Sequence, residues 1–121
     1  MSGNAVRCPQ GRLGLIALRV DGSAVTTSAS ATGLLMGSGQ VTIKKGSGGT
    51  SNEVTITLKE TAAQVPIVSA TPITTNCHVE IKSVTTSVIV LETFQVADGT
   101  TGVDDADMHV LIVVPLDSKD L

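Results

Sequence analysis

The residues best suited to bind an ion lie in one acidic stretch, Ala97 to Asp107, which contains four aspartates and two glycines. Calcium takes about six to eight oxygen ligands, and loops of this kind can supply them. The spacing does not match the helix-loop-helix calcium motif, which closes on a glutamate. The alternative is a solvated hairpin loop that turns at Asp98-Gly99. We favour that loop and expect no metal site and no cofactor. The weak calcium candidates are the carboxylates of Asp98, Asp104, Asp105 and Asp107.

Catalytic patterns are missing from the sequence. His78 and His109 have no second His or Cys at the short spacing of a zinc site, apart from Cys77, whose side chain points to the opposite face of the strand. Neither Gly37-Ser38-Gly39 nor Gly46-Ser47-Gly48 supplies the Gly-x-Ser-x-Gly of a nucleophile elbow. No Gly-Lys-Ser/Thr sequence closes a phosphate-binding loop. We therefore expect a protein that is not an enzyme.

Most of the chain alternates apolar and polar residues at the two-residue period of a β-strand. In the stretch 53–59, Val54, Ile56 and Leu58 point to one side, while the residues between them are polar. Such a strand has one face on a core and one face in water. The pattern predicts an all-β fold, an antiparallel β-sandwich or a flattened β-barrel. The predicted strands cover residues 12–20, 40–45, 53–59, 66–71, 77–84, 87–96 and 107–114.

The N-terminal third is less regular. Residues 1–11 contain Gly and Pro and little apolar surface, so we expect an extended arm, followed by a single β-domain over residues 12–121. Residues 12–20 fit either a strand or a short helix, and we favour the strand because Gly14 weakens a helix. Residues 23–39 are rich in Ser, Thr, Ala and Gly and predict a long loop, with an optional strand at 24–27.

Two hairpins are predicted. Residues 40–45 pair with 53–59 across a glycine-rich tip. Cys77 to Val84 pairs with Ser87 to Val96 through Thr85-Thr86. A two-residue loop there places Ile81 opposite Val90, and Cys77 opposite Phe94.

The predicted strands 87–96 and 107–114 carry apolar residues at both odd and even positions. Both faces of these strands are therefore expected to be covered. We expect a contact with another subunit, in a homotrimer or another closed oligomer. The alternative is that the N-terminal segment or the long loop folds over that face. The predicted interface residues are Ile89, Leu91, Leu111 and Val113.

Composition excludes several partners. The net charge of −3 gives no basic footprint for nucleic acid or for anionic membranes. The chain has one Phe and no Trp or Tyr, so it also lacks the aromatic platforms on which single strands stack. Cys8 and Cys77 are expected to be free thiols, because the sequence shows no signal peptide.

From Val54 onward the order of residues resembles the capsid decoration, or cement, proteins of tailed bacteriophages and related small β-structured virion proteins. The outline begins with the strand 54–58 and the segment Val65-Pro66-Ile67-Val68-Ser69-Ala70-Thr71-Pro72. It continues with Val88-x-Val90-x-Glu92-Thr93-Phe94 and closes with Asp98-Gly99-Thr100 and the stretch 105–112. These motifs cover about half of the chain.

The resemblance implies a structural virion protein that is made in the host cytoplasm and sits on the outer surface of the capsid. Such proteins are often trimers that bridge major capsid protein subunits. Arg7 and Arg12, two cations in an otherwise acidic chain, are the expected capsid contacts of the arm. The alternative is a receptor- or glycan-binding domain of a phage tail or fibre. Sugar binding usually needs an aromatic ring for stacking, and only Phe94 is available.

Overall fold

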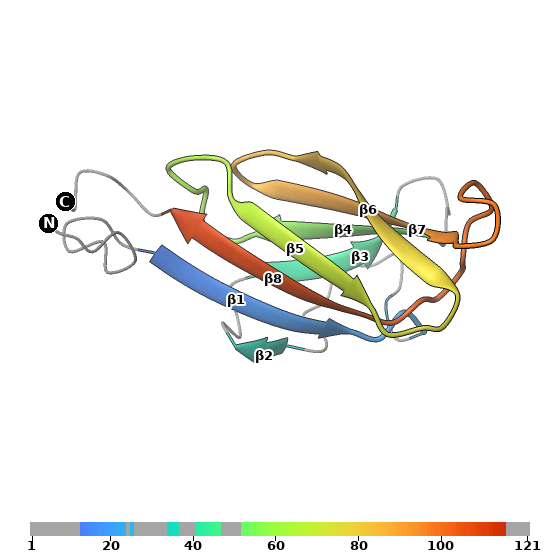
Figure 1. Ribbon diagram of the computed structural model, residues 1–121. Helices are drawn as coiled ribbons and strands as arrows, with labels where there is room; N and C mark the ends of the chain where they lie inside the picture. Colours follow the sequence, from blue (N-terminus) through green and yellow to red (C-terminus); the bar gives the residue numbers. More distant parts are fainter. Residues whose placement is uncertain (1–12, 24, 26–33, 37–40, 47–51, 116–121) are drawn as a thin grey trace, which may run out of the picture.

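The structure, a computed structural model, describes residues 13–23, 25, 34–36, 41–46 and 52–115. This part of the chain forms a sandwich of two antiparallel sheets (Figure 1). The all-β antiparallel prediction is therefore confirmed, and the arm predicted at residues 1–11 lies outside the described residues. The strands are β1 (Leu13–Val20), β2 (Leu34–Met36), β3 (Val41–Lys45), β4 (Glu53–Leu58), β5 (Ile67–Pro72), β6 (Cys77–Val84), β7 (Val88–Gln95) and β8 (Met108–Pro115).

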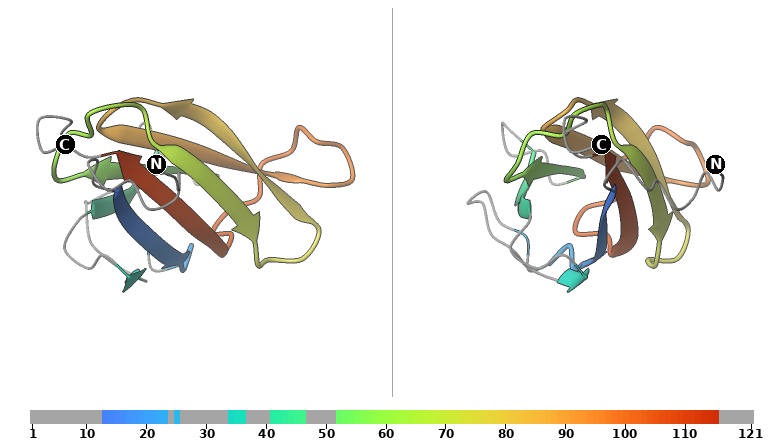
Figure 2. Two further views of the ribbon diagram at one scale, coloured as in Figure 1. Left: turned by 60° about the vertical axis from the view of Figure 1, so that its left-hand side comes forward. Right: turned by 90° about the vertical axis from the view of Figure 1, so that its left-hand side faces the viewer.

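The first sheet, called sheet A here, has the order β2-β1-β8-β5, and sheet B has the order β3-β4-β7-β6. The end-on view in Figure 2 shows the two sheets facing each other. In chain order, the strands change sheet after β2, β4, β5 and β7. Strands β5 and β6, which belong to different sheets, are in contact with each other (Figure 1). The central strands are thus β1 and β8 in sheet A, and β4 and β7 in sheet B.

One aliphatic core fills the space between the sheets, and the alternation along each strand builds it. In β4, Val54, Ile56 and Leu58 are buried, while Thr55 and Thr57 are partly exposed. The longest inward row comes from β8, which is polar only at His109. The remaining core side chains in the described residues are Ile16, Leu18, Val20, Val25, Val41, Ile43, Ala62, Ile89, Leu91, Met108, Val110, Ile112 and Val114.

The predicted strands correspond to seven of the observed strands. Residues 13–20 are strand β1, so the strand interpretation of residues 12–20 is confirmed. Strand β2 was not predicted and lies inside the expected loop 23–39. The optional strand at 24–27 falls mostly outside the described residues.

The β6–β7 hairpin exists, but its predicted register is wrong. Its turn is centred on Thr86-Ser87, because the Thr85 N–H donates to the Val88 carbonyl at 2.8 Å. The register then shifts between Ile81 and Ser83, where Lys82 is the extra residue of a β-bulge. As a result, Ile81 pairs with Leu91, and Cys77 pairs with Gln95.

The two ends of the described chain meet in sheet A. Strand β1 pairs with β8 along its whole length, from Leu13 opposite Pro115 to Val20 opposite Met108. Just beyond, the Gly22 N–H donates to Asp107 Oδ1 at 2.9 Å. A Cβ at Gly22 would lie only 2.2 Å from the Asp105 carbonyl carbon, so glycine is required there.

Among the described residues, no helix has the length and apolar character to span a bilayer.

We predict that Gly22→Ala lowers the free energy of unfolding by about 3 kcal/mol, because the backbone of residues 105–106 must move away from the new methyl group. The control is Gly99→Ala, where a Cβ meets nothing within 4 Å and the backbone has φ +69°. This control should cost about 1 kcal/mol, the penalty of a left-handed backbone for alanine. Urea unfolding of both variants measures the difference, and equal losses would contradict the close packing at Gly22.

Candidate functional site

The outward side of sheet A carries three of the large aliphatic side chains that are exposed in the described part of the chain, Leu15, Ile67 and Leu111. We define the sheet A face as the outward side chains of three strands: Leu15, Ala17 and Arg19 of β1; His109, Leu111 and Val113 of β8; and Ile67, Ser69 and Thr71 of β5. Strand pairing arranges them in three rows across the sheet. Each row takes one residue from each strand, because directly paired residues share a face.

The first row is fully aliphatic. Leu15 pairs with Val113, which pairs with Ile67. Leu15 is 46% exposed and Ile67 is 69% exposed, while Val113 is half-buried between them. The three side chains form one contiguous aliphatic strip across the sheet, which makes the row a candidate contact surface.

The second row has a different shape. Leu111, 43% exposed, stands between the small side chains of Ala17 and Ser69. A shallow hollow of about 350 Å³ lies beside it, and Thr71 and His109 complete its rim. The third row, Arg19 with His109 and Thr71, is polar. Its arginine gives the face a permanent positive charge.

Two of the four predicted interface residues do not lie on this face, and that part of the prediction is wrong. Ile89 and Leu91 are 0% exposed and form part of the core. Strand β7 has apolar residues on both of its sides. The side with Ile89 and Leu91 faces the core, whereas the prediction had placed these two residues on the outer side. Leu111 and Val113 do point outward from sheet A. The homotrimer itself stays a prediction.

The acidic stretch forms a protruding hairpin. Asp98 Oδ2 accepts the Thr101 hydroxyl, and Asp98 Oδ1 accepts the N–H groups of Thr101 at 2.9 Å and Thr100 at 3.0 Å. These hydrogen bonds, above all the one from the Thr101 hydroxyl, lower the pKa of Asp98 to about 2. The loop turns at Gly99, whose N–H donates to the Gln95 carbonyl at 2.8 Å.

The other three aspartates do not gather around a common point. Asp105 forms an ion pair with Lys45 of β3. Asp107 accepts the Gly22 N–H, and Asp104 is exposed. Within the described residues, no group of three or more His, Cys, Asp or Glu side chains is placed to hold a metal ion. The arrangement therefore favours the solvated hairpin over the calcium loop.

The two histidines lie on different sheets. His78 Nε2 is 3.0 Å from Glu80 Oε2, and the His78 ring packs on Phe94 with centroids 5.7 Å apart. His109 lies on the sheet A face. Cys77 is a buried free thiol, and burial raises its pKa. Cys8, Arg7 and Arg12 lie outside the described residues.

Sequence reasoning missed Thr93, the buried polar residue at the base of the acidic hairpin. Its hydroxyl is 2.8 Å from the Val103 carbonyl and 3.2 Å from the Asn52 carbonyl. The Thr93 N–H also donates to Asn52 at 2.9 Å. These hydrogen bonds hold the segment before β4, at Asn52, and the hairpin, at Val103, against β7. The available signal was a threonine at an inward position among apolar neighbours.

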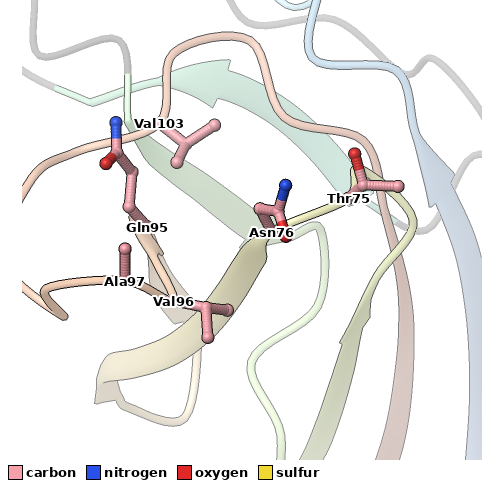
Figure 3. Close-up of a pocket in the computed structure, with 6 residues that line it drawn as sticks. All are labelled: Thr75, Asn76, Gln95, Val96, Ala97 and Val103. Carbon is pink, nitrogen blue, oxygen red and sulfur yellow. The ribbon is translucent and has the colours of Figure 1, made fainter.

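A second hollow opens beside the hairpin, at the C-terminal end of β7. It has a volume of about 510 Å³ and lies between the turn before β6 and the start of the hairpin (Figure 3). Two amide side chains, those of Asn76 and Gln95, contribute polar groups to it. The lining residues are Thr75, Asn76, Gln95, Val96, Ala97 and Val103.

Comparison of the chain with protein-family models, with curated proteins and with solved structures finds no match.

We predict that Leu91→Asp and Leu111→Asp behave differently. Leu91 is fully buried, so an aspartate there should cost about 4 kcal/mol or more and prevent stable folding. Leu111 points outward, so the same change should cost less than about 1 kcal/mol. Far-UV circular dichroism and urea unfolding test both variants. Equal stability losses would show that the two faces of the sandwich are assigned wrongly.

We predict that Thr101→Val raises the pKa of Asp98 from about 2 toward 3.8. The lowered pKa means that the Asp98 carboxylate contributes stability above pH 3.8, and that this contribution is lost as the pH falls to about 2. In the variant this contribution should be smaller, and its loss should be complete at a higher pH. Carboxyl NMR titration measures the pKa. Thr100→Val is the control, because Thr100 contributes only its N–H, and an equal shift there would contradict the role of the Thr101 hydroxyl.

Proposed function

We propose that the chain is a non-enzymatic structural protein that decorates a phage capsid and holds neighbouring capsid subunits together. The observation that carries this proposal is the sheet A face, an aliphatic surface on a small domain whose own core is already complete. A face of this kind suits permanent attachment to another protein. The resemblance of residues 54–112 to capsid decoration proteins supplies the kind of partner.

The rest of the domain supports a mechanical role. The hydrogen bonds of Thr93 and the ion pair between Lys45 and Asp105 fasten the loops at one end of the sandwich. The bond from Thr93 to Asn52 and the pair of Lys45 with Asp105 join segments that are distant in sequence. A domain fastened in this way keeps its surfaces in fixed relative positions, which a bridging protein requires.

The hollow beside the acidic hairpin favours a second candidate function, glycan binding on a tail or fibre. The amides of Asn76 and Gln95 are groups that hydrogen-bond sugar hydroxyls (Figure 3). The one aromatic ring, Phe94, is packed on His78 instead of forming a stacking platform in this hollow. The capsid proposal is therefore preferred.

We predict that antibodies against the chain label purified virions at many points spread over the shell. A capsid-bridging protein is present in many copies because the contacts between shell subunits repeat over the whole surface. Electron microscopy of gold-labelled particles provides the measurement, and an antibody against a tail protein serves as the control. Labelling confined to the tail would support the glycan-binding candidate, and unlabelled particles would contradict both.

A further inference from the structure

The charges of the described residues are divided unequally between the two outer faces of the sandwich. On the outer face of sheet B, Glu53, Glu92 and Glu80 form one row across three strands. Lys82 partly compensates this row: its Nζ is 2.9 Å from a Glu53 oxygen and 4.0 Å from a Glu92 oxygen. The outer face of sheet B therefore carries a row of three carboxylates that is partly neutralised by Lys82.

The sheet A face has the opposite character. Its described side chains include no carboxylate, although the chain as a whole is acidic. The aliphatic row of Leu15 and the row of Ala17, Leu111 and Ser69 are followed by the third row, which holds Arg19 and His109. A complementary partner is therefore apolar opposite the first two rows and carries a carboxylate opposite Arg19.

The size of the sheet A face argues against a second copy of this chain as the occupant. For the described part of the face, three strands about 4.8 Å apart, over five residues at about 3.3 Å each, give a flat area of about 250 Å². A stable pair of proteins buries about 800 Å² on each partner. Two copies placed face to face would also have only cations to offer each other.

A larger partner surface overcomes this limit, because a second segment can contact it at the same time. The predicted arm, residues 1–11, shortly precedes β1 in the sequence, and β1 contributes Leu15 and Arg19 to the face. Two contacts on one chain raise the overall affinity above that of either alone. The expected arginine contacts of the arm call for the same acidic partner as Arg19.

We propose, on the basis of the proposed function, that the sheet A face is the surface that docks on the capsid subunit. The face contacts an apolar patch of the capsid subunit, and a carboxylate at the edge of that patch lies opposite Arg19. The outer face of sheet B remains in solvent. Leu111 and the hollow beside it interlock with an aliphatic side chain of the partner.

The chain offers a matched pair of variants to test this assignment. Val113 of β8 and Val90 of β7 are both half-buried valines on central strands, but they point outward from opposite sheets. Binding of the full-length chain is measured on purified capsids that lack it, by co-sedimentation at a series of concentrations. We expect Val113→Lys to weaken binding at least about tenfold, and Val90→Lys to change it less than about twofold.

A second pair tests the charge. Arg19→Gln should weaken binding by about threefold or more and reduce its dependence on salt concentration. Lys44→Gln removes one cation from the outer side of sheet B and should do neither. Circular dichroism and the thermal midpoint show whether each variant is folded, and the Arg19 pair supplies the result if Val113→Lys is unfolded.

The possible outcomes separate this proposal from the proposed function. If the wild-type chain binds capsids and the sheet A variants bind equally well, the docking face is wrong while the function stands. If variants of both sheets lose binding alike, the assignment to sheet A is also overturned. Sedimentation that shows a stable oligomer, dissociated by Val113→Lys, would identify a second copy as the occupant and overturn the proposal. If the wild-type chain does not bind capsids, the proposed function fails, and the proposal fails with it.

Discussion

The pairing of β1 with β8 is the constraint on which the rest of the structure depends. It joins Leu13 to Pro115 and Val20 to Met108, so it closes a loop that contains nearly all of the described chain. Strands β2 and β5 can join sheet A only through β1 and β8. The pairing also brings Gly22 against residues 105–107, which anchors the base of the acidic hairpin. Because such distant segments must meet, we expect slow folding for a domain of this size.

Most strands were predictable because alternation is a local property of the sequence. The stretch 53–59 has a single apolar parity, so both its existence and its inward face follow from the residues. Strand β7 shows the limit of this reasoning: Val88 and Val90 lie on one parity, and Ile89 and Leu91 on the other. Which parity turns inward depends on the strands beside it, so the prediction of the interface was wrong for Ile89 and Leu91.

The β6–β7 register shows a second limit. Thr85-Thr86 and Thr86-Ser87 are equally good turn sequences, and only the hydrogen bonds of Thr85 distinguish them. The bulge at Lys82 has no composition signal at all, because an extra residue changes the pairing without changing the residue types. The sheet A face was partly predictable, through Leu111 and Val113. The presence of Leu15 and Ile67 on this face could not be predicted, because it depends on the order of the strands in sheet A.

The bulge at Lys82 also affects how closely copies of this protein can be placed. Strand β6 is the last strand of sheet B, and its free backbone groups are able to pair with a strand of a neighbouring molecule. A bulge twists such an edge, and a charged lysine in it makes a dry contact costly. Strand β5, the last strand of sheet A, follows Pro66 and ends at Pro72, and neither proline has an N–H to donate. At these two edges, the bulge in β6 and the prolines that flank β5 therefore disfavour strand pairing between copies of this protein.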